Sequence, residues 1–199
     1  AQILKAGGWR HALVSLSRGG SDAKVTREFD MKARSFVKGG FELLESKGSV
    51  SWIDSDHVYV TTDFGPGSMT TSGYPRIAKR WTRGTPLSAA EVAFEVKVTD
   101  VSVSAYFDDT QGFERHFVYR SPTFYTGELF LLTKDGKLKK VDVPEDAKTS
   151  VHREWLLIEL RSPWTLGGKT YAAGSLLAAL FDDYMKGGRK MTVLYEPSS

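Results

Sequence analysis

The sequence predicts an all-β fold, a partial β-propeller of about three complete four-stranded blades plus part of another. Three observations predict it: short runs of alternating apolar residues, glycine-rich turns between them, and a set of four such runs that recurs along the chain. The serines that open three sets, Ser49, Ser102 and Ser150, are 53 and 48 residues apart. Four strands in roughly 40–50 residues are typical of a propeller blade.

Each complete set gives four expected strands. They lie near 49–53, 57–62, 75–81 and 91–96 in the first set, near 101–106, 116–121, 127–133 and 137–142 in the second, and near 148–152, 155–161, 175–181 and 190–195 in the third. Upstream, "HALVSLS", "KVTREFD" and "FELL" look like the last three strands of an earlier unit that lacks its first strand. We therefore expect one propeller fragment over 1–199, with units at about 7–48 (partial), 49–100, 101–147 and 148–199.

Turn chemistry supports these boundaries. The chain has no asparagine, and its turns use glycine, which supplies the positive φ that tight turns need. "LFLLTKDGKLKKV" is the clearest hairpin, with Asp135-Gly136 between two apolar runs. "SLLAALFDDYMKGG" has a spacing that also suits a helix, so we expect a strand to Phe181 and then a helical turn that ends at Gly187.

Burial explains why such units would stack. A four-stranded blade has two apolar faces and covers neither alone, whereas neighbouring blades cover each other. The alternative with similar strands and turns is a β-sandwich. Three complete blades and part of another make an open arc, so we expect the chain to be a piece of a larger protein. We also expect the isolated arc to hide its terminal faces by self-association.

Composition excludes several function classes. The 199 residues are 41% hydrophobic, 12% aromatic and 26% charged, with a net charge of +3 and no cysteine. The basic residues are scattered, which argues against a nucleic-acid partner, and no apolar run reaches the roughly 18 residues of a membrane span. The absence of cysteine excludes disulfides and thiolate chemistry. It does not decide the cellular compartment, which can be the cytoplasm or the periplasm of a bacterium.

Catalytic and metal-binding motifs are not found. No segment fits the G-x-S-x-G nucleophile elbow or the phosphate-binding glycine patterns. The acidic pairs Asp54/Asp56 and Asp108/Asp109 raise the alternatives of a glycosidase or a calcium loop, but they stand in turns, where aspartate binds backbone amides. The histidines have no metal-ligand spacing; they are His11, His57, His116 and His152. We expect no catalytic residue, no metal and no cofactor in this chain.

Loops between the second and third strands of successive units should emerge on one face. These are 18–22, 63–75, 121–128 and 162–174, and they carry Phe64, Tyr74, Phe124, Tyr125, Trp164 and Tyr171. Aromatic loops on one face suit a contact surface, and the alternative is that these side chains pack against neighbouring blades.

Three long phrases in the chain resemble the N-terminal propeller of prolyl oligopeptidases, bacterial members in particular. They are "VSWIDSDHVYVTTDFGPGSMTTSGYPRIAKRWTRGTPLSAA", "GFERHFVYRSPTFYTGELFLL" and "RSPWTLGGKTYAAGSLLAALF". The resemblance implies a seven-bladed propeller joined to an α/β-hydrolase domain with a Ser-Asp-His triad, which cleaves short peptides after proline. The propeller would cap the active site and gate access, and neither the triad nor the hydrolase domain falls within this chain.

One site residue follows from the resemblance. "LSRGGSDAKVTREFD" is similar to the family's Gly-Ser-Asp loop, whose aspartate faces the peptidase domain and pairs with a basic residue there. This implies an interdomain or substrate-gating role for Asp22, with a plain turn role as the alternative. The partners implied are the peptidase domain of the same parent chain and short proline-containing peptides. A rival from another class is a stand-alone propeller module that binds peptide or carbohydrate.

Overall fold

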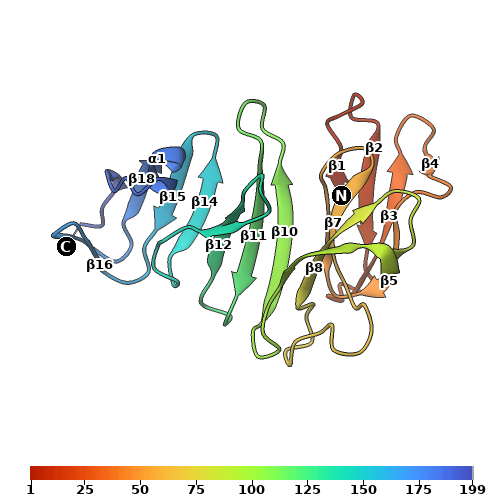
Figure 1. The fold of residues 1–199 in the computed structure, drawn as a ribbon, viewed down its shortest axis with the longest axis horizontal. Helices are drawn as coiled ribbons and strands as arrows, with labels where there is room; N and C mark the ends of the chain where they lie inside the picture. Colours follow the sequence, from red (N-terminus) through yellow and green to blue (C-terminus); the bar gives the residue numbers. More distant parts are fainter. Residues whose placement is uncertain (199) are drawn as a thin grey trace.

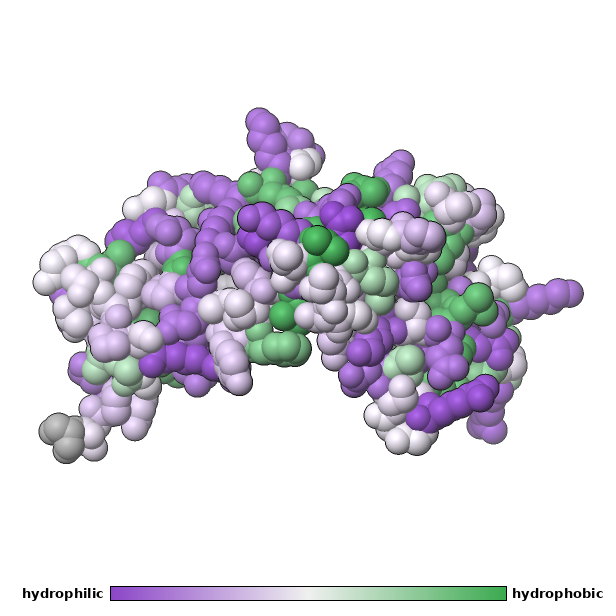
Figure 2. Space-filling model, turned by 90° about the horizontal axis from the view of Figure 1, so that it is seen from below, coloured by the Kyte–Doolittle hydropathy of each residue, from purple (hydrophilic) through white to green (hydrophobic). Residues whose placement is uncertain are grey.

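Four antiparallel sheets stand side by side in the computed structural model, which describes residues 1–198. They follow one another in chain order along the long axis (Figure 1), and seen from below they form an open arc with one concave side (Figure 2). The all-β prediction of a partial propeller is confirmed.

The second, third and fourth sheets have the predicted four strands each. The second contains β6 (Ser49–Trp52), β7 (His57–Thr61), β8 (Ile77–Thr82) and β9 (Glu91–Glu95), and the short helix η1 (Leu87–Ala89) precedes β9. The third contains β10 (Ser102–Asp108), β11 (Arg115–Ser121), β12 (Glu128–Leu132) and β13 (Leu138–Lys140). The fourth contains β14 (Lys148–His152), β15 (Trp155–Glu159), β18 (Leu176–Leu180) and β19 (Thr192–Tyr195).

The first sheet corrects one prediction. Its strands are β1 (Gln2–Ile3), β2 (His11–Leu16), β3 (Lys24–Asp30), β4 (Ser35–Phe36) and β5 (Glu42–Ser46). The first strand was predicted to be absent, but β1 pairs with β2 in the register Gln2↔Leu13. Two residues are too short to show an alternating pattern, so the sequence gives no sign of this strand.

Two local elements complete the fold. The helix α1 (Phe181–Met185) begins directly after β18, as the mixed spacing predicts, and Phe181 is fully buried. The long connection from β15 to β18 contains the hairpin of β16 (Trp164–Leu166) and β17 (Lys169–Tyr171), which was expected to be a loop. Its turn is formed by Gly167 and Gly168, whose φ values of 58° and 81° are left-handed.

Both faces of the inner sheets are buried. In β7, Val58 and Val60 belong to the apolar cluster between the first and second sheets, whereas Tyr59 belongs to the cluster between the second and third. In β11, Val118 joins that second cluster and Phe117 joins the cluster between the third and fourth sheets. Alternate residues of one strand thus supply two different cores, as the pleat of a strand requires.

Backbone approaches backbone closely where the first sheet leads into the second. Gly48 has a φ of 149°, and a Cβ placed there would lie 2.0 Å from the carbonyl oxygen of Thr61. The neighbouring pair Ser49↔Thr61 starts the β6–β7 ladder. Glycine is therefore needed at 48 for the chain to pass from one sheet to the next.

A buried ion pair links the first two sheets. The Glu28 side chain, from β3, is fully buried and accepts hydrogen bonds from Arg83 Nη1 at 2.9 Å and Nη2 at 3.0 Å. It also accepts the backbone N–H of Phe41 at 3.0 Å and contacts His11 Nδ1 at 2.8 Å. Burial raises the pKa of Glu28, but the hydrogen bonds from Arg83 and Phe41 outweigh it, so the pKa is lowered overall.

No helix within residues 1–198 is long and apolar enough to cross a membrane.

Replacing Arg83 with Met should destabilise the protein strongly, because the buried carboxylate of Glu28 would lose its bidentate partner. We expect the free energy of unfolding to fall by about 3 to 5 kcal/mol, the range for breaking a buried pair from one side. Urea denaturation measures the loss. The control is Lys137→Met, since Lys137 and Asp135 form an exposed pair worth less than about 1 kcal/mol. Equal losses in the two variants would contradict the prediction.

Candidate functional site

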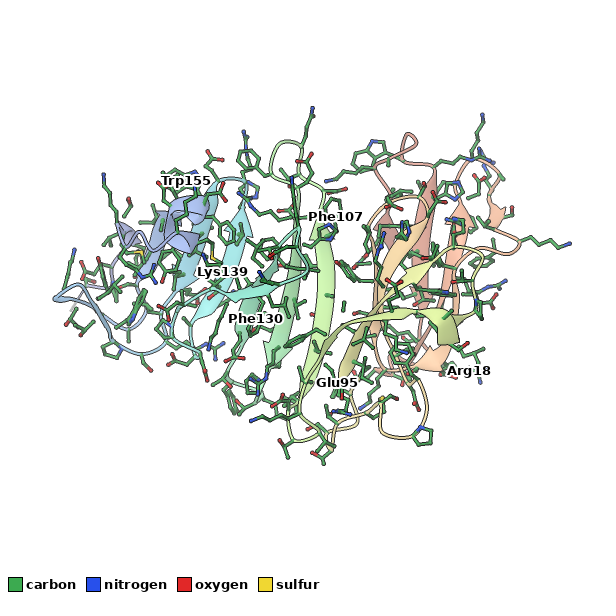
Figure 3. The ribbon with its side chains drawn as sticks, viewed as in Figure 1. Arg18, Glu95, Phe107, Phe130, Lys139 and Trp155 are labelled. Atoms are coloured by element: carbon green, nitrogen blue, oxygen red, sulfur yellow. The ribbon has the colours of Figure 1, made fainter. Side chains whose placement is uncertain are left out.

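The loops between the second and third strands of the four sheets lie at one edge of the arc, the lower edge in Figure 1. We call this edge the rim; its loops are 17–23, 62–76, 122–127 and 160–175. Arg18, in the first of these loops, lies low in Figure 3, whereas Phe107 and Trp155 lie toward the opposite edge. Figure 2 views the rim directly and shows mostly hydrophilic and pale residues with small hydrophobic patches.

Asp22 lies on the rim with an exposed carboxylate. Its loop turns at Gly19 and Gly20, whose φ values are 60° and 81°. The Ser21 N–H donates to the Arg18 carbonyl at 3.1 Å, and the Ser21 hydroxyl accepts from the Ala23 N–H at 3.1 Å. The turn is thus completed by neighbours of Asp22, and the Asp22 side chain, 64% exposed, is left free to meet other groups.

Two side chains from other loops meet Asp22. The Tyr74 hydroxyl donates a hydrogen bond to Asp22 Oδ2 at 3.0 Å. Lys47, in the turn between β5 and β6, places Nζ 3.9 Å from the same oxygen and 4.3 Å from the centre of the Tyr74 ring. The hydrogen bond to Asp22 raises the pKa of Tyr74, because ionising the phenol would place two negative charges side by side. We call these three residues the Asp22 cluster.

Tyr74 is held in place by its own loop. The Tyr74 N–H donates to Thr70 Oγ1 at 3.3 Å, and the Thr70 N–H donates to the Tyr74 carbonyl at 2.8 Å. Thr70 is buried, and its hydroxyl donates to the Val101 carbonyl at 2.9 Å. The cluster therefore joins a loop of the first sheet to a braced loop of the second.

Two residues of the predicted aromatic surface are strongly exposed, and a third, Tyr74, is partly buried and belongs to the Asp22 cluster. Phe124 and Tyr125 are 75% and 77% exposed. Their loop is shaped by Thr123, whose hydroxyl oxygen accepts the N–H groups of Tyr125 and Thr126 at 3.1 Å each. They border a cavity of about 310 Å³ that Tyr74 and Arg161 also line.

Three aromatic residues of the rim, Tyr171, Trp164 and Phe64, pack inward. Tyr171 is buried, and Trp164 packs against the cluster between the third and fourth sheets. Phe64 packs against the cluster between the first two sheets, and Lys79 Nζ lies 4.3 Å from its ring centre. For these residues the packing alternative is correct.

Three of the histidines, His11, His57 and His116, and the acidic pairs have structural partners, whereas His152 is exposed. His57 Nδ1 lies 2.9 Å from Asp54, and His116 Nδ1 lies 2.9 Å from the Tyr59 hydroxyl. Burial, with a smaller effect of Arg80, lowers the pKa of His116. Asp54 accepts the N–H of Asp56 at 2.8 Å, and Asp108 accepts that of Thr110 at 3.0 Å, as expected of turn residues.

Within the part of the chain that the structure describes, no three His, Cys, Asp or Glu side chains are grouped to hold a metal ion. The chemistry that the rim offers is recognition: a carboxylate for a cation and two exposed rings for an apolar surface. The sequence pointed to Asp22 and Tyr74 separately, but not to their contact and not to Lys47. A lysine before a turn glycine carries no signal of such a role.

Sequence comparisons point to peptidases. No protein-family model matches the chain. An uncharacterized peptidase of Rickettsia prowazekii is 30% identical over 203 residues, and one of Sinorhizobium fredii is 35% identical over 173 residues. The matches cover 94% and 83% of this chain, which spans only 28% and 24% of those proteins.

Structural comparisons agree. A post-proline cleaving enzyme from Rickettsia typhi superposes with a TM-score of 0.87 at 30% identity, over 96% of this chain and 30% of that one. A prolyl endopeptidase matches at a TM-score of 0.72 and oligopeptidase B of Leishmania major at 0.64, each at 14% identity and over all of this chain. These matches cover 29% and 26% of the two enzymes, and at such identity they show the fold alone.

The pKa of Tyr74 provides a direct test of the Asp22 cluster. In Asp22→Asn we expect it to fall toward the ordinary tyrosine value of about 10, because the neighbouring negative charge is gone. NMR titration with 13C-labelled tyrosine measures it. Asp146→Asn is the matched control, since Asp146 lines the cavity beside the rim and accepts a hydrogen bond from Ser162 instead. A Tyr74 titration that is the same in both variants would show that the contact does not form in solution.

Proposed function

We propose that this chain, a segment of a prolyl-oligopeptidase-type propeller, forms part of the non-catalytic cap of a serine peptidase domain in the same parent chain. Its four units, at about 7–48 with β1 (Gln2–Ile3) added to the first, 49–100, 101–147 and 148–199, act as blades of that cap. The cap gates access, so that short proline-containing peptides reach the active site and folded proteins do not. The chemistry belongs to the peptidase domain, where a serine attacks the peptide carbonyl and a histidine moves the proton.

One observation carries the proposal. Nearly the whole chain superposes on less than a third of a post-proline cleaving enzyme that is 30% identical to it. A segment of a larger peptidase would give a match of this kind, complete for the segment and partial for the enzyme. It also agrees with a sequence that has no nucleophile elbow, because the segment is not the catalytic part.

The rim suits a surface that meets a second domain. Asp22 offers an exposed carboxylate for a cation, and Phe124 and Tyr125 offer exposed apolar area. Large aromatic side chains are enriched at protein–protein interfaces, and a carboxylate can form a charge-assisted hydrogen bond with a basic residue of the other surface. We therefore assign the rim as the face toward the peptidase domain and Asp22 as a residue that contacts it.

A second candidate is a stand-alone module that binds peptide or carbohydrate. The observation in its favour is the cavity of about 310 Å³ beside Phe124 and Tyr125, because exposed rings stack on sugars and on proline. The two proposals differ in what the rim meets: a domain of the same chain in the first, a free ligand in the second.

Asp22→Asn in the full-length protein separates the two. If Asp22 contacts the peptidase domain, kcat/KM for a chromogenic Gly-Pro peptide should fall about tenfold, which corresponds to about 1.4 kcal/mol. Asp146→Asn, in the lining of the cavity beside the rim, should leave it unchanged. An unchanged kcat/KM in Asp22→Asn would count against the interdomain role. If the purified 199-residue chain also bound a proline-containing peptide saturably, the binding module would be favoured.

We also propose that the isolated chain self-associates through the outer face of its fourth sheet. Trp155 and Leu180 are directly paired neighbours there and are 39% and 44% exposed. A further blade would cover this face in the parent protein, and a second copy is the substitute when none is present. Light scattering of the 199-residue chain should show dimers or larger species, and Leu180→Glu should reduce them. A monomer at high concentration would refute this.

A further inference from the structure

We propose that Lys47 competes, within the chain, with the cation that docks on Asp22, and that Tyr74 is the positioning residue that orients the Asp22 carboxylate. This rests on the proposed role of Asp22 at the face toward the peptidase domain. The Asp22 cluster would then set the balance between a docked and an undocked rim.

The geometry leaves one oxygen of Asp22 available. Tyr74 donates to Oδ2, and Lys47 lies near the same atom. Among residues 1–198, no hydrogen bond to Oδ1 is formed. A docking guanidinium or ammonium group can therefore bind Oδ1 while the tyrosine holds the other oxygen and fixes the plane of the carboxylate.

Lys47 affects docking through its charge. Its Nζ is 3.9 Å from Asp22 Oδ2, longer than a hydrogen bond, so it neutralises the carboxylate without occupying a lone pair. A second cation at Asp22 would stand within several ångströms of Nζ, where like charges repel even on a solvated surface. Lys47 is 35% exposed and rests on the Tyr74 ring, which keeps its charge at this place.

Tyr74 ties the cluster to the fold. Its loop is braced by the buried Thr70, and it reaches from the second sheet to a loop of the first. The hydroxyl is the part that touches Asp22, so Tyr74→Phe removes the orientation while it keeps the ring beneath Lys47. The two roles therefore predict opposite effects: loss of the hydroxyl weakens docking, and loss of the lysine charge strengthens it.

The experiment measures hydrogen exchange of the rim in the full-length protein, in peptides that cover 17–23 and 62–76. In Lys47→Met we expect protection to rise about fivefold, the size of effect typical of an exposed ion pair. In Tyr74→Phe we expect it to fall by a similar factor, and in Lys47→Arg, which keeps the charge, we expect no change. Lys169→Met is the matched control, since Lys169 lies on the rim and its Nζ is 4.9 Å from the Tyr171 ring centre, away from Asp22.

The outcomes distinguish this inference from the function on which it rests. If Asp22→Asn does not change rim protection, Asp22 is not a docking residue, and both its interdomain role and the competitor role of Lys47 are wrong. If Asp22→Asn lowers protection but Lys47→Met lowers it too or leaves it unchanged, the competitor role of Lys47 is wrong and the interdomain role of Asp22 stands. If the rim of Tyr74→Phe is as protected from hydrogen exchange as the wild-type rim, the Tyr74 hydroxyl does not position the Asp22 carboxylate. Thermal melts of each variant show whether a change in exchange comes from lost stability instead.

Discussion

The fold depends on one constraint: each four-stranded sheet has two apolar faces, and neither can be left in water. The structure meets it by placing three apolar clusters between four sheets, so that the second and third sheets are covered on both sides. Strand β7 shows the constraint at the level of single residues, since Val58 and Tyr59 are neighbours in sequence but belong to different clusters. Each core is therefore shared, and a sheet is stable only next to its neighbour.

Buried polar groups add specificity at the same junctions. Glu28 and Arg83 link the first two sheets, and Asp100 and Arg120 link the second and third through a bidentate pair at 2.9 and 3.0 Å. A buried carboxylate is costly unless its partner is in place, so an alignment of the sheets that separated either pair would be disfavoured.

Much of the fold could be predicted because strand period and turn chemistry are local. The Asp135-Gly136 hairpin and the turn from strand to helix at Phe181 are where the sequence places them. The two-residue strand β1 and the three-residue strands β16 and β17 were missed, because such short strands show no alternating pattern. A different limit applies to the rim: Asp22 has a recognisable loop, but its contacts with Lys47 and Tyr74 come from segments 25 and 52 residues away.

The rim can serve recognition because the fold does not depend on it. The stabilising contacts lie between the sheets, whereas Asp22, Phe124 and Tyr125 are exposed on loops whose turns are completed by neighbouring residues. Changes in these side chains therefore alter what the rim binds with little effect on the sheets beneath. Tyr74 is the exception, since its loop reaches the buried Thr70 and through it the start of the third unit at Val101. Hydrogen bonds of the Tyr74 hydroxyl, the Tyr74 backbone and the Thr70 hydroxyl thus connect Asp22 to the junction of the second and third sheets.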